Sequence, residues 1–197
     1  VNAVSFGLQQ GAIGCLLGAS GCGKATLLRA VAGFGPLTGG EISLRGAVVS
    51  DPRGMLAIEK RRVGMVFQDH SLFPHLTVSQ NIGFGLEGWA KSASFRRIEE
   101  IASLLEIDDY LFEYPHRMSG GQQQRVAIAR SIVNKPKILF ADEPTGNLDE
   151  KNSIKLVDLL HQINKDYNQT IILTTHNPDI ASIGHRQFIL ENGFLRK

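Results

Sequence analysis

The nine residues GASGCGKAT, Gly18 to Thr26, decide the fold of this chain. They follow the pattern G-x-x-x-x-G-K-[ST] except in the last place, where Ala25 stands instead of a serine or threonine. In such a loop the glycines let the backbone curl, so that its N–H groups point inward, and the following helix adds the positive end of its dipole. The stretch therefore predicts a site for nucleotide phosphates in which one magnesium-ligating hydroxyl is missing.

The residues on both sides of the loop favour this interpretation. Residues 12–17 form a short apolar run that predicts a buried strand leading into the loop. From Lys24 to Ala32 the apolar residues keep helical spacing, and Gly33 ends the helix. A glycine-rich turn formed by accident is a much weaker explanation when a strand precedes it and a helix follows. We assign cofactor binding to the whole loop: Gly18, Ala19, Ser20, Gly21, Cys22, Gly23, Lys24, Ala25 and Thr26.

A second motif, ILFADEP, spans residues 138–144. An apolar strand that ends in two carboxylates places both of them at the carboxyl edge of a sheet, where α/β proteins bind ligands. Asp142 is positioned to hold the water shell of a metal ion, and Glu143 to orient a water molecule that attacks the γ-phosphate. The alternative is an acidic strand end that simply faces solvent. It is the weaker interpretation here, because the chain also carries a phosphate loop with which the two carboxylates can act.

A third motif, MSGGQQQR, spans residues 118–125. Ser119 followed three residues later by Gln122 is a capping box, which predicts that a helix starts here. Gly120 and Gly121 leave the N–H groups of its first turn open to an anion. A well-capped helix with no further role is the alternative, although glycines in the first turn cost helix stability.

The order of the expected elements indicates an α/β fold. The alternation of Val4, Phe6 and Leu8 predicts a half-exposed strand, and residues 33–46 predict a hairpin at a sheet edge. Residues 63–67 predict a short strand ending at Gln68. The apolar residues then keep helical spacing from about residue 76 to 134. After Pro136 strands alternate with helices again: we expect strands at 138–141 and 171–175 with a helix between them.

Composition narrows the functional classes. The chain has 197 residues, 43% of them apolar, with 21 basic against 19 acidic side chains and a formal net charge of +2. This balance, without a basic stripe, argues against nucleic acid as a partner. The two cysteines fit neither a zinc spacing nor a disulfide framework, so we expect a reducing, cytoplasmic location. The sequence shows no signal peptide and no apolar run long enough to cross a membrane.

Taken together, the motifs resemble those of the nucleotide-binding subunits of ABC transporters. Six motifs occur in that family's order between Gly18 and Asn177: GASGCGKAT, FQDHSLFPHLTV, MSGGQQQR, ILFADEP, GNLD and TTHN. The resemblance implies a P-loop NTPase core, namely a mostly parallel sheet flanked by helices, with a small antiparallel β part and an inserted helical subdomain. We expect a single domain, 1–197, with its core at 1–71 and 135–197 and its helical subdomain at 72–134.

The resemblance also implies a role for each motif residue in binding and hydrolysing ATP with Mg²⁺. Lys24 and the loop backbone would hold the phosphates, and Thr26 would assist at the α-phosphate. Glu143 would be the catalytic base, and His176 would contact the γ-phosphate. The metal would be held by two residues, Gln68, which would also reach the attacking water, and Asp142.

The partners expected from the resemblance are a second copy of the chain and a transmembrane permease. Residues Ser119, Gly120, Gly121 and Gln122 would clasp ATP bound to the opposite subunit of a head-to-tail dimer. Asp149 would cross the interface. Phe73, Pro74 and Leu76 are suited either to contact the permease or to pack locally. The protein would then lie on the inner face of the cell membrane and drive solute transport.

The sequence departs from the family pattern in two further ways. We find no strand before residues 4–8 and no aromatic residue to stack on adenine, so the first strand is expected to be missing. The N-terminal half resembles ferric-iron-type importers, whereas ADEPTGNLD and TTHN resemble lipoprotein-release and macrolide-export ATPases. The transported solute, and the direction of its transport, are therefore left open.

Two rival functions remain beside the transport ATPase. The chain would be an ATP-binding module with impaired hydrolysis if Ala25 spoils the metal site, and steady-state turnover with magnesium separates these two cases. The chain would instead be a soluble ABC ATPase of DNA repair or translation if it carried a coiled-coil or zinc insertion, or a second cassette. The sequence has none of these features.

Overall fold

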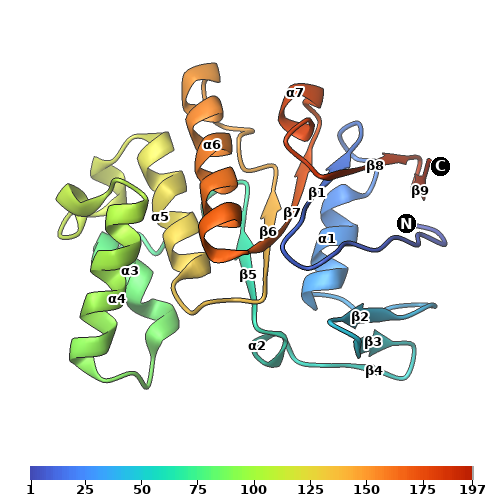
Figure 1. The fold of residues 1–197 in the computed structure, drawn as a ribbon, viewed down its shortest axis with the longest axis horizontal. Coiled ribbons are helices and arrows are strands. Elements are labelled where there is room, and N and C mark those ends of the chain that lie inside the picture. The colour runs from blue at the N-terminus through green and yellow to red at the C-terminus, as the bar shows by residue number, and fades with distance from the viewer. Residues whose placement is uncertain (197) are drawn as a thin grey trace.

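The computed structural model describes residues 1–196, and a six-stranded sheet forms the centre of the molecule (Figure 1). All neighbouring strands in it run parallel except the last pair, β8 and β9. In spatial order the strands are β5 (Val63–Val66), β6 (Ile138–Asp142), β7 (Thr170–Thr175), β1 (Ile13–Leu17), β8 (Arg186–Glu191) and β9 (Phe194–Leu195).

Helices cover both faces of this sheet because its central strands carry apolar side chains on both sides. On one face Leu139, Ala141 and Ile171 lie in a core that includes residues of α5 (Gly120–Ile132) and α6 (Glu150–Tyr167). On the other face Leu16, Phe140 and Ile172 form a second core with Leu28, Val31 and Ala32 of α1 (Lys24–Ala32). The short helix α7 (Pro178–Ala181) joins β7 to β8.

A small antiparallel sheet lies beside α1 and is fastened by one buried arginine. It consists of β2 (Ile42–Leu44), β3 (Ala47–Asp51) and β4 (Gly54–Met55). Arg61, in the short helix α2 (Ile58–Arg61), is 3% exposed and donates to the Val31 and Val49 carbonyls and to the Ser50 hydroxyl. These bonds tie the end of α1 to the small sheet.

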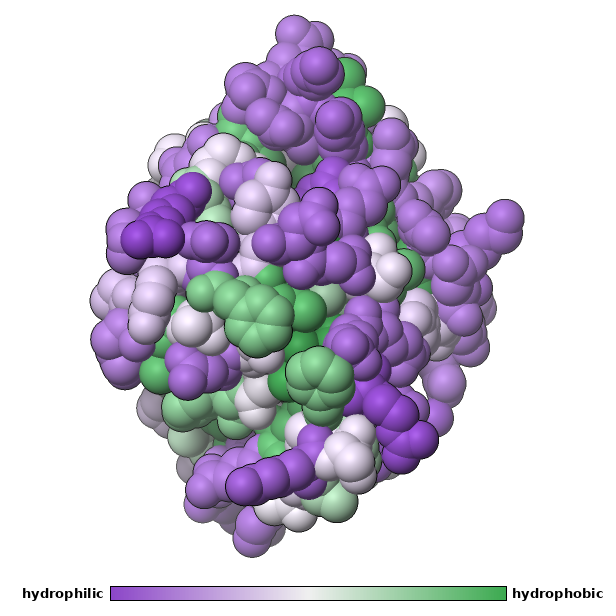
Figure 2. All heavy atoms as spheres, turned by 90° about the vertical axis from the view of Figure 1, so that its left-hand side faces the viewer, coloured by the Kyte–Doolittle hydropathy of each residue, from purple (hydrophilic) through white to green (hydrophobic). Residues whose placement is uncertain are grey.

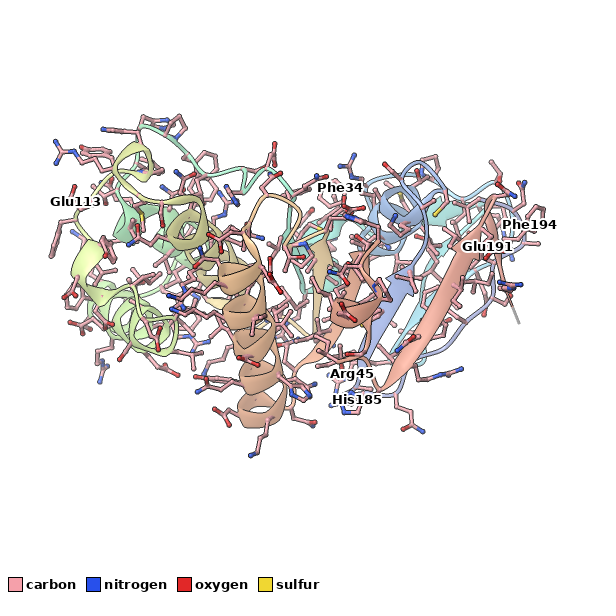
Figure 3. The ribbon with its side chains drawn as sticks, turned by 90° about the horizontal axis from the view of Figure 1, so that it is seen from above. Phe34, Arg45, Glu113, His185, Glu191 and Phe194 are labelled. Carbon is pink, nitrogen blue, oxygen red and sulfur yellow. The ribbon has the colours of Figure 1, made fainter. Side chains whose placement is uncertain are left out.

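The region between β5 and β6 is helical and occupies one end of the molecule. Its helices are α3 (Val78–Gly83), α4 (Lys91–Leu104) and α5, with single 3₁₀ turns at Phe84–Leu86, Asp108–Tyr110 and Pro115–Arg117. Seen from above, Glu113 lies at this end of the molecule, and Glu191 and Phe194 lie at the opposite end (Figure 3). Within residues 1–196 no helix combines the length and the apolar character needed to cross a bilayer.

The structure confirms the expected α/β architecture and corrects three details of it. Residues 4–8 form no strand: Phe6 instead lies against Phe188, with ring centroids 4.8 Å apart, and packs on the core that contains α1. The hairpin belongs to the separate small sheet rather than to an edge of the large one. Phe67 lies outside its strand, which ends at Val66.

Candidate functional site

The predicted site residues come from the carboxyl ends of four adjacent strands. The glycine loop follows β1, Asp142 and Glu143 stand at the end of β6, His176 follows β7, and Gln68 follows β5. Because these strands are parallel neighbours, their ends meet at one edge of the sheet. The sheet therefore brings together motifs that are more than a hundred residues apart in the sequence.

The glycine loop requires glycine at two places in particular. A side chain at Gly18 would collide with the Leu190 carbonyl oxygen and would lie 2.7 Å from the Cys22 sulfur. Gly23 precedes α1 with a φ of 105°, in the left-handed region that favours glycine. Within residues 1–196 no side chain caps α1, so the N–H groups of its first turn are free for an anion.

Lys24 lies at the centre of the site and folds back over the loop that carries it. Its Nζ donates to the Gly18 carbonyl at 2.7 Å and to the Ala19 carbonyl at 2.9 Å, and it lies 3.4 Å from Glu143 Oε1. The side chain is 5% exposed. The ammonium is thus held between the loop and the end of β6, at the place where the backbone N–H groups of the loop would bind phosphates.

Asp142 is held in place by a neighbour that the sequence motifs did not single out. The Thr174 hydroxyl donates to Asp142 Oδ1 at 2.9 Å and accepts from the Glu143 N–H at 2.9 Å. Thr174 is fully buried on β7. Arg29 of α1 approaches the other carboxylate oxygen, Oδ2, at 3.6 Å. Thr174 belongs to the TTHN stretch, so its position was visible in the sequence, but its contacts were not.

Glu143 is positioned between Lys24 and His176. Its Oε2 lies 3.1 Å from His176 Nδ1, which donates when that nitrogen carries the proton. The backbone of Glu143 has a φ of 44°, a left-handed conformation that is uncommon for a residue with a side chain. Such a conformation costs free energy and persists when the surrounding structure holds it.

The backbone of Gln68 contacts the loop that follows Glu143. Its carbonyl accepts from the Asn147 side chain at 2.9 Å, which joins the end of β5 to the loop after Glu143. Its side-chain amide lies beside Gly146, where a Cβ would be 3.4 Å from Nε2. Gln68 is exposed, and no hydrogen bond within residues 1–196 joins its side chain to Asp142 or Glu143.

The residues at this edge fit a magnesium ion that is held mainly by phosphates and water. The donors are one carboxylate, Asp142, and one amide, Gln68, while Ala25 offers no side-chain oxygen. Among residues 1–196 no group of three His, Cys, Asp or Glu side chains is placed to hold a metal. Mg²⁺ usually keeps several waters and binds through one or two carboxylates plus substrate phosphates. This donor set is therefore compatible with a metal that arrives with the nucleotide.

The residues of the MSGGQQQR motif lie apart from the glycine loop. Ser119 caps α5 as predicted: its hydroxyl accepts from the Gln122 N–H at 3.3 Å, and the Gln122 side chain accepts from the Ser119 N–H at 2.8 Å. Gly121 faces Asn152, at the beginning of α6. Asp149 caps α6 by accepting from the Asn152 N–H at 2.8 Å. In residues 1–196 no hydrogen bond connects Ser119 to Gln122 with the loop at 18–26, and Ser119 is exposed.

The segment that follows Gln68 is fixed by two side chains of the helical region. Arg130 of α5 donates to the Ser71 carbonyl at 2.8 Å and lies over the Phe73 ring at 5.3 Å. Burial lowers the pKa of this guanidinium. Asn81 is fully buried, accepts from the Phe73 N–H, and donates to the Phe73 and Leu76 carbonyls.

A groove of about 530 Å³ opens between this segment and β5. Phe73, Phe84 and Met65 are among its lining residues. Apolar side chains gather on the face at the helical end of the molecule, ringed by hydrophilic ones (Figure 2). The exposed aromatic residues of the helical region are Phe84, Trp89, Phe95, Phe112 and Tyr114.

A glycine loop on a mostly parallel sheet, with its lysine beside a carboxylate at the end of the strand that carries Asp142 and Glu143, defines a fold of the P-loop NTPase class. The family model described as ABC transporter matches residues 1–146. The dimeric structure of MJ0796, a bacterial ABC transporter cassette, superposes with a TM-score of 0.87 at 31% identity and covers 98% of this chain and 87% of that one. The chain therefore belongs to the ABC transporter family.

Relatives with different roles align over nearly the whole chain. The Fe(3+) ions import ATP-binding protein FbpC of Fusobacterium nucleatum is 39% identical over 196 residues, 98% of this chain and 52% of that protein. The cell division ATP-binding protein FtsE of Streptococcus pneumoniae is 39% identical over 197 residues, 98% of this chain and 85% of that protein. The chain thus spans about half the length of FbpC but most of FtsE.

Proposed function

We propose that this chain binds ATP with Mg²⁺ and hydrolyses it to drive transport through a membrane partner. The observation that carries this proposal is the meeting of Lys24, Glu143 and His176 at the mouth of the glycine loop. Lys24 lies 3.4 Å from Glu143, and His176 lies 3.1 Å from the same carboxylate. A lysine and open helix N–H groups can hold phosphates, and a carboxylate beside them can orient the attacking nucleophile, which are tasks that phosphoryl transfer requires.

The chain's own residues have separate tasks in this proposal. The loop N–H groups and Lys24 bind the phosphates, and Lys24 leaves the Gly18 and Ala19 carbonyls to do so. Glu143 orients the attacking water, and His176 holds the Glu143 carboxylate and contacts the γ-phosphate. Mg²⁺, held by Asp142 and Gln68, would neutralise charge on the phosphate oxygens. Thr174 fixes Asp142 and the backbone of Glu143 together, so that the two carboxylates keep their spacing.

The proposed active unit is a head-to-tail dimer. No hydrogen bond within residues 1–196 joins residues 119–122 to the glycine loop of the same chain, and the Ser119 end of α5 is exposed. A helix terminus with two glycines offers N–H groups to an anion, and here that anion is the ATP of the opposite subunit. The structural relative MJ0796 is dimeric. Asp149, which is exposed beside this terminus, is placed to cross the interface.

The membrane partner is proposed to bind at the groove beside Phe73. Phe73 and Leu76 are half-buried and Pro74 is exposed, on a segment that Arg130 and Asn81 hold rigidly. We propose residues 72–134 as the helical subdomain and residues 1–71 and 135–197 as the core, with the partner between them. The chain would then lie on the cytoplasmic face of the membrane. The solute stays unassigned, because relatives named for iron import and for cell division are equally similar.

A second candidate, an ATP-binding module with slow hydrolysis, is favoured by Ala25 alone. Ala25 is the second residue of α1, beneath the expected position of the phosphates, and its side chain supplies no oxygen. ATP would still bind, because the loop N–H groups and Lys24 are intact. The metal ion would be held in a less fixed position, and hydrolysis would therefore be slow.

Phosphate release with ATP and Mg²⁺, measured beside ATP binding by calorimetry, tests the proposal and separates its two forms. We expect binding in either case, and turnover that Glu143→Gln abolishes. Binding without turnover would support the slow module. Lys24→Ala is the control, since it removes the cation and should weaken ATP binding. A chain that binds no ATP, or whose phosphate release survives Glu143→Gln, would contradict the assignment.

A further inference from the structure

A buried glutamine connects the N-terminal end of α5 with the loop that follows Glu143. Gln124 lies in α5 five residues after its cap, Ser119, and its side chain is 1% exposed. Its Nε2 donates to the Pro144 carbonyl at 2.7 Å. Pro144 directly follows Glu143. The helix that presents residues 119–122 is therefore joined by one hydrogen bond to the residue directly after the proposed catalytic base.

The backbone is held on both sides of Glu143 by different elements. On one side the Glu143 N–H donates to the hydroxyl of Thr174, on β7. On the other side the Pro144 carbonyl accepts from Gln124, on α5. The turn between them closes on itself through the Gly146 N–H, which donates to the Glu143 carbonyl at 3.0 Å. Glu143 thus lies between one anchor from the sheet and one from the helical region.

The second anchor matters because Glu143 is in a strained conformation. Its φ of 44° is left-handed, and such residues relax when the contacts that hold them are removed. Relaxation would turn the carboxylate away from Lys24 and His176. Only the donor half of the Gln124 amide does this work, since its Oε1 has no hydrogen-bond partner among residues 1–196.

We propose that Gln124 is a positioning residue that holds Glu143 in its working geometry from α5. The inference rests on the proposed function, in which Glu143 is the base and residues 119–122 bind the nucleotide of the opposite subunit. A shift of α5 on nucleotide binding would then reach Glu143 through this bond. No such connection runs through Gln123, whose Nε2 donates to the Pro115 and Met118 carbonyls.

The first test needs no catalytic turnover. Gln124→Leu removes the donor with little change in volume, and hydrogen exchange of the segment 143–148 is compared with that of the unmodified protein. We expect exchange in this segment to rise by about tenfold, the factor that loss of one hydrogen bond supports. Exchange in α6 should not change. Gln123→Leu is the matched control and should leave segment 143–148 unaffected. Unchanged exchange in Gln124→Leu would overturn the inference.

Gln124→Glu provides a second test, because it changes the ability of the side chain to donate while its size stays almost the same. A protonated carboxylic acid at this place can donate to the Pro144 carbonyl, whereas a carboxylate cannot. Burial raises the pKa of such a group, so the bond is present at low pH and lost as the pH rises. Exchange of segment 143–148, relative to the unmodified protein at each pH, should therefore increase with pH. A pH-independent ratio would contradict the proposal, and this variant also serves if Gln124→Leu does not fold.

Kinetics separate this inference from the proposed function. In Gln124→Leu we expect kcat to fall by about tenfold and KM to stay within about twofold, because positioning is lost and binding is not. If the unmodified chain releases no phosphate, the proposed function fails while the exchange result still stands. If hydrolysis is normal and Gln124→Leu changes neither kcat nor exchange, this inference alone fails.

Discussion

Ala25 and Arg29 lie one turn apart on α1, and both bear on the metal site that we propose at Asp142. Residues four apart on a helix share a face, so the guanidinium that lies 3.6 Å from Asp142 comes from the face where the hydroxyl is missing. Arg29 is 55% exposed in its side chain. It therefore has room to move aside when a divalent cation takes its place. The carboxylate itself stays fixed, because Thr174 holds its other oxygen.

We expect Ala25→Ser to raise Mg²⁺-dependent ATP hydrolysis by at least about tenfold, a cautious fraction of what one preorganised contact contributes. The added hydroxyl would be a third side-chain ligand for the metal, beside the proposed ligands Asp142 and Gln68. Binding of ATP without metal should change little. Phosphate release and calorimetry measure the two effects separately. Ala25→Cys is the matched control and should not raise the rate, because its thiol is close in size to the hydroxyl but sulfur is a poor ligand for Mg²⁺. Equal rates in Ala25→Ser and the unmodified protein would show that the hydroxyl is not needed here.

At the scale of the elements, β5 and α5 approach each other more closely than a side chain would allow. A Cβ at Gly64 would collide with the Ser131 carbonyl oxygen and would lie 3.2 Å from Pro136. This contact places the start of the Gln68 segment against the helix that carries Ser119 and Gln124. The spacing between the core and the helical region therefore depends on one missing methyl group.

Gly64→Ala should destabilise the fold by about 2 kcal/mol, since it forces the new Cβ against the Ser131 backbone in a close-packed region. Thermal unfolding should show a lower Tm. The matched control is Gly54→Ala on β4, where the added Cβ meets no heavy atom within 4 Å. It should leave the Tm within about a degree, as expected for a surface substitution. Equal Tm values in the two variants would contradict the close approach of β5 and α5.

The sequence predicted the elements whose signals are local. Strands β1, β6 and β7 are apolar runs, and α1 lies between Gly23 and Gly33, so their positions follow from nearby residues. The alternation at residues 4–8 predicted a strand that does not form, because Phe6 packs on Phe188 without a strand to pair with. Strand β8 was missed because charged residues open and close it.

The contacts around the site were less predictable than its members. Sequence motifs named Lys24, Asp142, Glu143 and His176, and the parallel sheet brings all four together. They did not indicate that the Thr174 hydroxyl joins the Asp142 carboxylate to the backbone N–H of Glu143, because that contact depends on which strands are neighbours. The link from Gln124 to Pro144 likewise joins residues twenty apart in the sequence whose elements meet only in the folded chain.

At the scale of the whole molecule, the proposed dimer would combine the exposed terminus of α5 of one chain with the glycine loop of the other. We expect Glu143→Gln, which blocks the proposed hydrolysis but not binding, to accumulate an ATP-bound dimer. Size-exclusion chromatography with ATP measures it. Adding Ser119→Arg should abolish the dimer, because the serine serves the opposite subunit, while ATP binding to the single chain persists. A monomeric Glu143→Gln protein in saturating ATP would count against the dimer.

The strand order also sets the distance between the two ends of the candidate site. Gln68, Glu143, His176 and the glycine loop follow β5, β6, β7 and β1, which are successive neighbours. Parallel strands lie about 4.8 Å apart, so the loop and Gln68 are separated by three spacings, roughly 14 Å. Under the proposed function, the phosphates are held at the loop end of this span, and Gln68 would meet them only through the metal ion or the attacking water. The segment that Arg130 anchors continues directly from Gln68, so the lining of the groove begins where the span of the proposed nucleotide site ends.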